Sequence, residues 1–202
     1  MRRRLWNVSL GIAAALILAL TAGRFFVLQS IEVRDHGMQP RLGVGDTLLV
    51  DRTANEYGPG DIVVFYRADI PFLRRVVAMP GDRVGLADGV VTVNGIAAET
   101  EPRGEVAYKD LGADDAAGLG ERKCERTLES HSLTFYEICR SQGPDERPRD
   151  LQARYIPPGH YWLLCDNRFH CPGDSRELGP VAKGAIRGRA VYRMSRAAEL
   201  EP

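Results

Sequence analysis

An uncharged stretch close to the N-terminus restricts what this chain can fold into more than any other feature. The stretch runs from Leu5 to Gly23 and follows three arginines at positions 2–4. It is about long enough to cross the hydrocarbon core of a bilayer as a helix. Because positive charge tends to stay on the cytoplasmic side, the arginines predict an inside N-terminus and an outside location for the remainder. We therefore expect a cytoplasmic basic tip over residues 1–4 and a transmembrane signal anchor over residues 5–28.

A cleaved signal peptide is the alternative interpretation of the same stretch. Cleavage needs small residues in a small-x-small pattern, and Leu20 with Ala22 fits that pattern poorly. Apolar residues also resume after Arg24, from Phe25 to Leu28. Both observations favour a retained anchor.

The composition indicates a folded, turn-rich domain without a strong net charge. Hydrophobic residues make up 44% of the 202 residues, which supports a packed core in one domain or in one domain with an insertion. Lys plus Arg and Asp plus Glu both number 27, so no overall field attracts nucleic acid, and we expect no nucleic-acid partner. The 12 prolines and 21 glycines favour a β-rich fold with many turns.

Segments rich in β-branched and aromatic residues alternate with turn signals after the N-terminal stretch. The turn signals include YGPG at 57–60 and Asn94-Gly95, which is the strongest short cue for a hairpin. The predicted strands lie within residues 47–52, 61–67, 73–79, 90–95, 133–138, 160–168 and 185–193.

A change in composition divides the expected β domain. Residues 98–150 are polar and charged, which indicates an inserted β subdomain. We therefore expect a mainly β, antiparallel core over residues 29–97 and 151–195, and a tail over residues 196–202.

Four cysteines fit an extracytoplasmic domain that contains two disulfides. Cys124 and Cys139 lie in one region, and Cys165 and Cys171 lie in another. Local pairing is the simplest of the three possible connectivities, and the sequence alone does not select among them. A metal site is the alternative, since His170 adjoins Cys171, but no spacing matches a zinc pattern. We expect neither a metal nor a cofactor.

Four blocks, taken in order after the N-terminal stretch, carry a family resemblance. They are GMQPRLGVGDTLLVDR at 37–52, GDIVVF at 60–65, RRVVAMPGDRV at 74–84 and IPPGHYWLLCDNRFHCPGDSRELGPV at 156–181. Together they resemble the bacterial type I signal peptidases, which are membrane-anchored serine peptidases with a Ser/Lys dyad. The resemblance implies an antiparallel β-barrel or sheet core of the signal peptidase I type. It also implies a bacterial inner-membrane protein with a periplasmic domain.

The positions that carry the chemistry in that family differ in this chain. The resemblance places Gly37 at the nucleophilic serine, Arg74 at the lysine general base and Asp35 at a hydroxyl that helps to hold the oxyanion. Glycine has no side chain and cannot form an acyl-enzyme. Arginine stays a cation with five donors and no acceptor, so it cannot replace a lysine base. A carboxylate at position 35 would repel a developing oxyanion.

Two functions remain open at this point. The first is a non-catalytic homologue, or pseudopeptidase, that binds a signal peptide, a precursor protein or a membrane-protein partner. The second is an active serine endopeptidase that processes secreted or pilin-like precursors through an unrecognised or altered site. Nothing marks Ser30, His36 or Ser175 as an activated replacement. Asp35 and Arg74 carry opposite charges, and we expect them to form an ion pair that fills the emptied cleft.

The remaining candidate residues have supporting roles by resemblance. Those expected near the substrate groove are Met38, Pro40, Phe72 and Leu73, although the apolar members fit an ordinary core equally well. Family members hold an extended substrate segment by strand addition, and such binding can survive the loss of chemistry. Residues expected to support the wall and turns of the site are Asp166, Asn167, Asp174, Ser175 and Arg176. Cys165 stands where the family usually has glycine, and a Cys165–Cys171 disulfide would clamp this altered loop.

Overall fold

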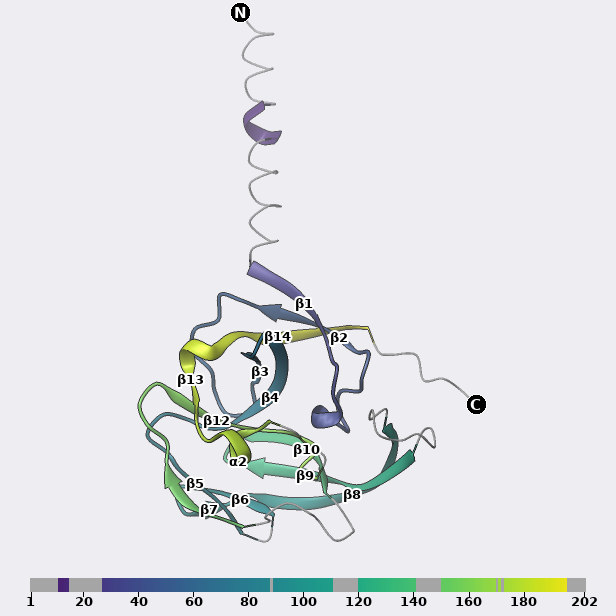
Figure 1. Cartoon of the computed structure of the whole chain (residues 1–202), viewed down its shortest axis with the longest axis vertical. Helices are drawn as coiled ribbons and strands as arrows, with labels where there is room; N and C mark the ends of the chain where they lie inside the picture. Colours follow the sequence, from purple (N-terminus) through teal and green to yellow (C-terminus); the bar gives the residue numbers. More distant parts are fainter. Residues whose placement is uncertain are drawn as a thin grey trace, which may run out of the picture.

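The computed structural model describes residues 11–14, 27–87, 89–110, 120–140, 150–169, 171 and 173–195. Figure 1 shows the arrangement of the described strands and short helices. Within the described residues, no helix combines the length and the hydrophobicity that membrane crossing requires. The predicted basic tip over 1–4, most of the predicted anchor over 5–28 and the predicted tail over 196–202 lie outside the described residues.

The described part of the chain is mainly antiparallel β structure, as the sequence predicts. The largest sheet has the strand order β1-β2-β14-β3-β4-β12-β13, with every neighbouring pair antiparallel. Its strands are β1 (Leu28–Glu32), β2 (Thr47–Asp51), β3 (Ile62–Arg67), β4 (Ile70–Ala78), β12 (His160–Leu164), β13 (Val181–Ala182) and β14 (Ile186–Ser195). Strands from both ends of the chain therefore build one sheet.

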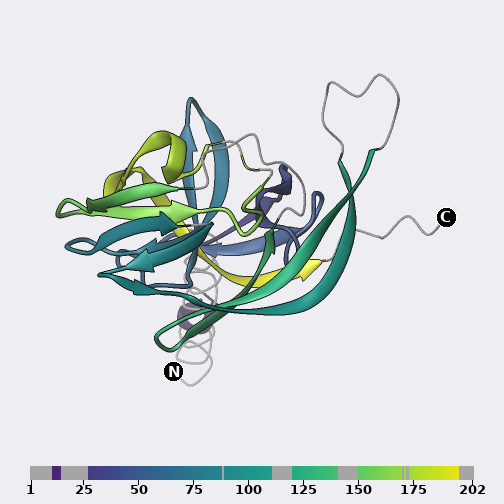
Figure 2. The ribbon, with the colours of Figure 1, turned by 90° about the horizontal axis from the view of Figure 1, so that it is seen from below.

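Two smaller antiparallel sheets complete the fold. One has the order β11-β5-β6-β7 and consists of β5 (Arg83–Ala87), β6 (Val90–Val93), β7 (Ile96–Ala97) and β11 (Leu151–Tyr155). The other has the order β10-β9-β8 and consists of β8 (Glu99–Asp110), β9 (Gly120–His131) and β10 (Thr134–Arg140). Figure 2 shows β8 and β9, in teal and green, curving together along one side of the molecule. This sheet falls within the segment whose composition indicates an insertion.

Three short helical turns connect the strands. They are η1 (His36–Met38), α2 (Ser175–Leu178) and η2 (Lys183–Ala185). Asn94 and Gly95 both have positive φ, 54° and 81°, and form the predicted hairpin turn between β6 and β7.

Each of the seven predicted strand segments overlaps a strand of the structure, but one predicted segment extends too far. The segment 160–168 is predicted as one strand, but β12 ends at Leu164. The chain then leaves the large sheet because the next residues pair elsewhere. Cys139 on β10 donates its N–H to the Asp166 carbonyl and accepts the N–H of Arg168, both at 2.9 Å.

Central strands of the large sheet are buried on both faces, which explains their continuous apolar sequences. On β3, Val64 packs into one core cluster, while Val63 and Phe65 point to the opposite face and pack into another. On β12, Trp162 and Leu163 separate in the same way. The alternation follows from the two-residue period of a strand. On β4, every residue from Leu73 to Ala78 is buried as well.

Candidate functional site: the loop at Gly37

The loop at Gly37 is shaped by an acidic cap. Asp35 is extended, and its Oδ1 accepts the N–H of Gly37 at 2.8 Å at the start of η1. Aspartate is a preferred residue at this position because its carboxylate satisfies an N–H that the helical turn leaves unpaired. All three residues of η1 are buried. The sequence DHGM thus forms a tight turn whose glycine lies inside the protein.

Arg74 reaches this loop from β4 and forms the predicted ion pair. Its Nη1 lies 3.0 Å from Asp35 Oδ2 and donates to the Leu73 carbonyl at 2.6 Å. Its guanidinium carbon lies 5.2 Å from the centre of the Phe72 ring, within the range of a cation–π contact. The Arg74 side chain is 0% exposed and the Asp35 side chain is 27% exposed. The positive charge of Arg74 is therefore neutralised within the protein.

The space into which a side chain at position 37 would project is already filled. A Cβ at Gly37 would lie 2.8 Å from Asp35 Oδ1, 2.9 Å from Cys165 Sγ and 3.0 Å from Arg74 Nη1. These distances are well inside ordinary carbon contacts of about 3.5–4.0 Å. The three atoms come from three different segments of the chain. Glycine at this position is therefore a packing requirement of the loop.

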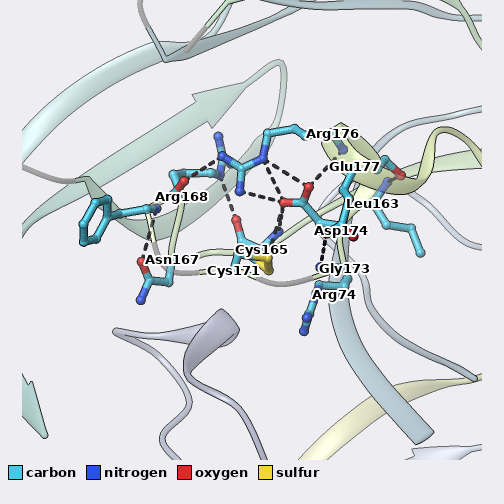
Figure 3. Close-up of polar contacts among 12 residues, drawn as sticks. Arg74, Leu163, Cys165, Asn167, Arg168, Cys171, Gly173, Asp174, Arg176 and Glu177 are labelled. Atoms are coloured by element: carbon cyan, nitrogen blue, oxygen red, sulfur yellow. Dashed lines mark hydrogen bonds and ion pairs between the residues drawn. A yellow bond between two sulfur atoms is a disulfide. The ribbon is translucent and has the colours of Figure 1, made fainter. Parts of the chain in front are cut away.

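The four cysteines form two local disulfides, which is the simplest of the connectivities considered from the sequence. Cys124 joins Cys139 between β9 and β10, and Cys165 joins Cys171 at the end of β12. Figure 3 shows the second disulfide next to Asp174. The two sulfurs and a carboxylate oxygen of Asp174 lie within 4.8 Å of one another. Because the sulfurs are bonded to each other, they do not offer the thiolates that a zinc site needs.

The segment after Cys165 holds the Gly37 loop from its other side. The Asn167 N–H donates to the Gly37 carbonyl at 2.8 Å. The Asn167 side-chain amide donates to the His36 carbonyl at 3.2 Å and to the hydroxyl of Tyr108 at 3.0 Å. The His36 ring also contacts Tyr108, with ring centres 5.5 Å apart. Because Tyr108 lies on β8, the sheet β10-β9-β8 takes part in holding the loop.

Two further buried ion pairs lie where the sheet β10-β9-β8 meets the rest of the fold. Arg75 donates to Asp166 through Nε at 2.6 Å, and its guanidinium carbon lies 4.4 Å from the centre of the Tyr136 ring. Arg168 forms a two-point contact with Glu129 on β9, at 2.9 and 2.6 Å. Burial is the largest single effect on the pKa of Arg168 and would lower it, but Glu129, Tyr136 and Asp166 together raise that pKa above its ordinary value.

Tyr136 completes the same buried cluster. Its hydroxyl donates to Glu129 Oε1 at 2.8 Å. Burial raises the pKa of Tyr136 above its ordinary value of 10.0, and the Glu129 charge adds to the effect. Tyr136, Glu129 and Arg75 were not among the candidates from sequence. The sequence does contain one signal for Arg75, because two adjacent arginines lie inside an otherwise apolar strand. A buried strand tolerates two such charges only when both are paired.

Asp174 and Arg176, the predicted acidic–basic pair, contact each other. Asp174 accepts the backbone N–H and the Nε of Arg176 at 2.9 and 3.1 Å (Figure 3). Arg176 Nη1 in turn donates to the Arg168 carbonyl at 2.6 Å. The Ser175 hydroxyl accepts the N–H of Leu163 at 2.9 Å and is fully buried. This serine therefore joins α2 to β12.

Among the apolar residues expected near the substrate groove, some are buried in the core and others are partly exposed. Met38 and Leu73 are buried in the cluster beneath η1, so in this structure they are core side chains. Phe72 is partly buried and stacks on Phe65 with ring centres 5.5 Å apart. Pro40 follows η1 and is half-buried.

Comparison with known proteins identifies the family. Residues 5–195 match the family model described as "Signal peptidase, peptidase S26". The chain is 28% identical over 196 residues to signal peptidase I of Bacillus caldolyticus, covering 95% of this chain and 89% of the relative. It is 26% identical over 197 residues to signal peptidase IB of Staphylococcus aureus (strain Mu50 / ATCC 700699), covering 96% and 91%. The antiparallel β fold and the four sequence blocks define a signal-peptidase-like protein. The chain belongs to the signal peptidase, peptidase S26 family.

Among solved structures, the chain is similar to a signal peptidase I from Enterococcus faecalis V583. The TM-score is 0.37 with 20% sequence identity, and the match covers 67% of this chain and 97% of the other. The family assignment rests on the sequence match over residues 5–195.

Proposed function

We propose that this chain is a non-cleaving member of the signal peptidase family, a pseudopeptidase. In this proposal it binds an extended peptide segment of a signal peptide, a precursor protein or a membrane-protein partner without hydrolysing it. Residues 5–28 anchor it in the bacterial inner membrane and the β domain lies on the periplasmic side. The arginines before the uncharged stretch and the family's type of organisation support this placement.

The observation that carries the proposal is the filled space at Gly37. A serine there would place its Cβ within 3.0 Å of Asp35, Cys165 and Arg74. The ion pair with Asp35 also holds the Arg74 guanidinium as a donor, so the position of the family's base offers no proton acceptor. In place of the Ser/Lys chemistry there is thus a glycine enclosed by Asp35, Cys165 and Arg74, and an arginine paired with Asp35.

A cleavage assay tests the loss of chemistry. The detergent-solubilised full chain is incubated with a secretory precursor, and products are identified by mass spectrometry. We expect no cleavage at the signal-peptide junction by the unmodified chain. Cleavage that survives removal of contaminating host peptidase would overturn the proposal in favour of an active endopeptidase.

A graded series of restorations tests the reason for the loss. Gly37→Ser with Arg74→Lys restores the dyad alone, and adding Asp35→Ser removes the repelling carboxylate. Adding Cys165→Gly with Cys171→Ala then clears the third obstruction. We expect activity only in the later members of the series, because the first retains two of the three close contacts.

A binding assay tests the retained recognition. Fluorescence anisotropy compares a labelled signal peptide with a scrambled peptide of the same composition in the same detergent. We expect saturable binding of the signal peptide alone. Equal binding of both peptides would contradict a role in peptide recognition.

A further inference from the structure

The segment that follows Cys165 is held between two parts of the fold. On one side, Asn167 donates its N–H to the Gly37 carbonyl. On the other side, Cys139 of β10 forms backbone hydrogen bonds with Asp166 and Arg168. The segment therefore connects the sheet β10-β9-β8 to the loop at Gly37.

The Cys165–Cys171 disulfide fixes this segment directly against the emptied site. Both cysteines are 0% exposed, and the Cys165 sulfur lies 2.9 Å from the point that a Cβ at Gly37 would occupy. Two unbonded thiols need more room than two bonded sulfurs. Reduction therefore displaces at least one sulfur, and a displacement of Cys165 changes the packing at Gly37.

The second disulfide lacks this property. Cys139 lies on β10, which pairs with β9 over the continuous register Thr134–Arg140. That ladder keeps the two strands together when the bond is cleaved. Cys165 and Cys171 instead lie outside the strands, so their bond is a main covalent restraint on the described residues between them.

We propose that the Cys165–Cys171 disulfide is a reducible clamp on the loop at Gly37. The oxidised form closes the loop against Cys165 and Arg74, and the reduced form opens it to a small side chain of a bound peptide. The second half of this inference rests on the proposed function as a peptide binder. A dithiol supplies the chemistry: one thiolate displaces one cysteine through a mixed disulfide, and the second thiolate displaces the other. The dithiol leaves as a disulfide, and two electrons and two protons remain on the cysteines.

Hydrogen exchange of two amides tests the clamp in the full chain. Labelling is carried out in detergent with and without dithiothreitol and is read by residue-level mass spectrometry. On reduction we expect the Asn167 amide, bonded to Gly37, to exchange about tenfold faster or more. The Arg168 amide, bonded to Cys139, is the internal reference and should change much less. Equal exchange at Asn167 in both states would overturn the proposal.

Two matched variants separate this disulfide from the other. Cys165→Ala/Cys171→Ala should exchange like the reduced protein and should no longer respond to dithiothreitol. Cys124→Ala/Cys139→Ala should keep the response at Asn167. A response that disappears with the second variant and persists with the first would assign the switch to the wrong disulfide and contradict the clamp. If the first variant fails to fold, the wild-type comparison still decides.

Anisotropy with the labelled signal peptide tests the consequence for binding. We expect reduction to tighten binding about tenfold or more, equivalent to about 1.4 kcal/mol. Tighter binding by the oxidised form would contradict the opening of the site. An exchange response without peptide binding in either state would support the clamp and contradict the proposed function, so the two can fail separately.

Discussion

A buried guanidinium destabilises a β core unless its charge and its donors are paired. Arg74 is 0% exposed, and its partners are the Asp35 carboxylate, the Leu73 carbonyl and the Phe72 ring. Asp35 also caps the turn that contains Gly37. The residues at positions 35, 37 and 74 therefore form one packed unit, and a change at one alters the surroundings of the others.

Substitution of Gly37 by alanine should destabilise the protein. The added Cβ meets Asp35, Cys165 and Arg74 at 2.8–3.0 Å, so at least one of them must shift. Overpacking of this kind typically costs about 1–3 kcal/mol. Urea unfolding of the detergent-solubilised chain measures the change.

Gly43→Ala is the matched control for this substitution. A Cβ at Gly43 would have its nearest neighbour, the Gln39 Nε2, at 3.5 Å, which is an ordinary contact. We expect an unfolding midpoint close to that of the wild type. An equal loss in both variants would show that packing at Gly37 is not special.

Removal of Asp35 should lower the free energy of unfolding more than removal of Arg74. Asp35→Ala leaves a fully buried cation without its carboxylate and should cost on the order of 3 kcal/mol. Arg74→Met leaves a carboxylate that is 27% exposed and can be hydrated, so the loss should be smaller. Urea midpoints of the two variants and of the double variant measure the difference. A greater loss for Arg74→Met would contradict this account.

At the scale of elements, the β9–β10 hairpin depends on a neutral tyrosine. Burial and Glu129 raise the pKa of Tyr136 in the folded state above its ordinary value of 10.0. Between these two values the unfolded chain loses the proton while the folded chain keeps it. The contribution of neutral Tyr136 to the free energy of unfolding is therefore complete below about pH 10. It should decrease as the pH rises above that value.

The measurement is the unfolding midpoint between neutral and alkaline pH. Tyr136→Phe should lose stability at neutral pH because Glu129 loses a donor, and its midpoint should fall less steeply above about pH 10. Tyr155→Phe is the control, since that side chain is 53% exposed on β11. An unchanged alkaline slope in Tyr136→Phe would contradict the role of Tyr136.

Seven of the described strands overlap segments predicted from sequence, because their signals are local. The β-branched run at 61–67 gives β3, and the Asn94-Gly95 pair gives the turn after β6. The end of β12 at Leu164 could not be predicted in this way. It depends on backbone pairing of Asp166 and Arg168 with Cys139, a contact between segments distant in sequence.

At the scale of the whole molecule, the last described strand lies in the middle of the largest sheet. β14 pairs with β2 on one side and with β3 on the other. Removal of the chain after Ala185 would expose the edges of both partners. We expect such a truncation to show no cooperative unfolding transition, as measured by circular dichroism during urea titration.

Truncation after Ser195 is the control for this experiment. It leaves β14 and all its described pairings intact, so the unfolding midpoint should match that of the full chain. A cooperative transition in the shorter truncation would contradict the central role of β14.

The candidate site was predictable only in part, for a related reason. The order of the four sequence blocks singles out positions 35, 37 and 74 as candidates. The opposite charges of Asp35 and Arg74 predict their contact, which the structure has at 3.0 Å. Sequence spacing contains no information on how near the Cys165 sulfur lies to Gly37, because that contact joins the first and last blocks. The role of Tyr108 is hidden for the same reason, since β8 reaches the loop only through tertiary structure.

The contacts around Gly37 also limit how this protein can evolve. A serine introduced there by a single substitution would meet three neighbours at 3.0 Å or less, before any benefit from a hydroxyl could arise. A lysine at position 74 alone would keep Asp35 beside it as a counter-ion. Each first step towards a Ser/Lys dyad is therefore disfavoured unless the other positions have already changed. The packing makes the effects of these substitutions depend on one another.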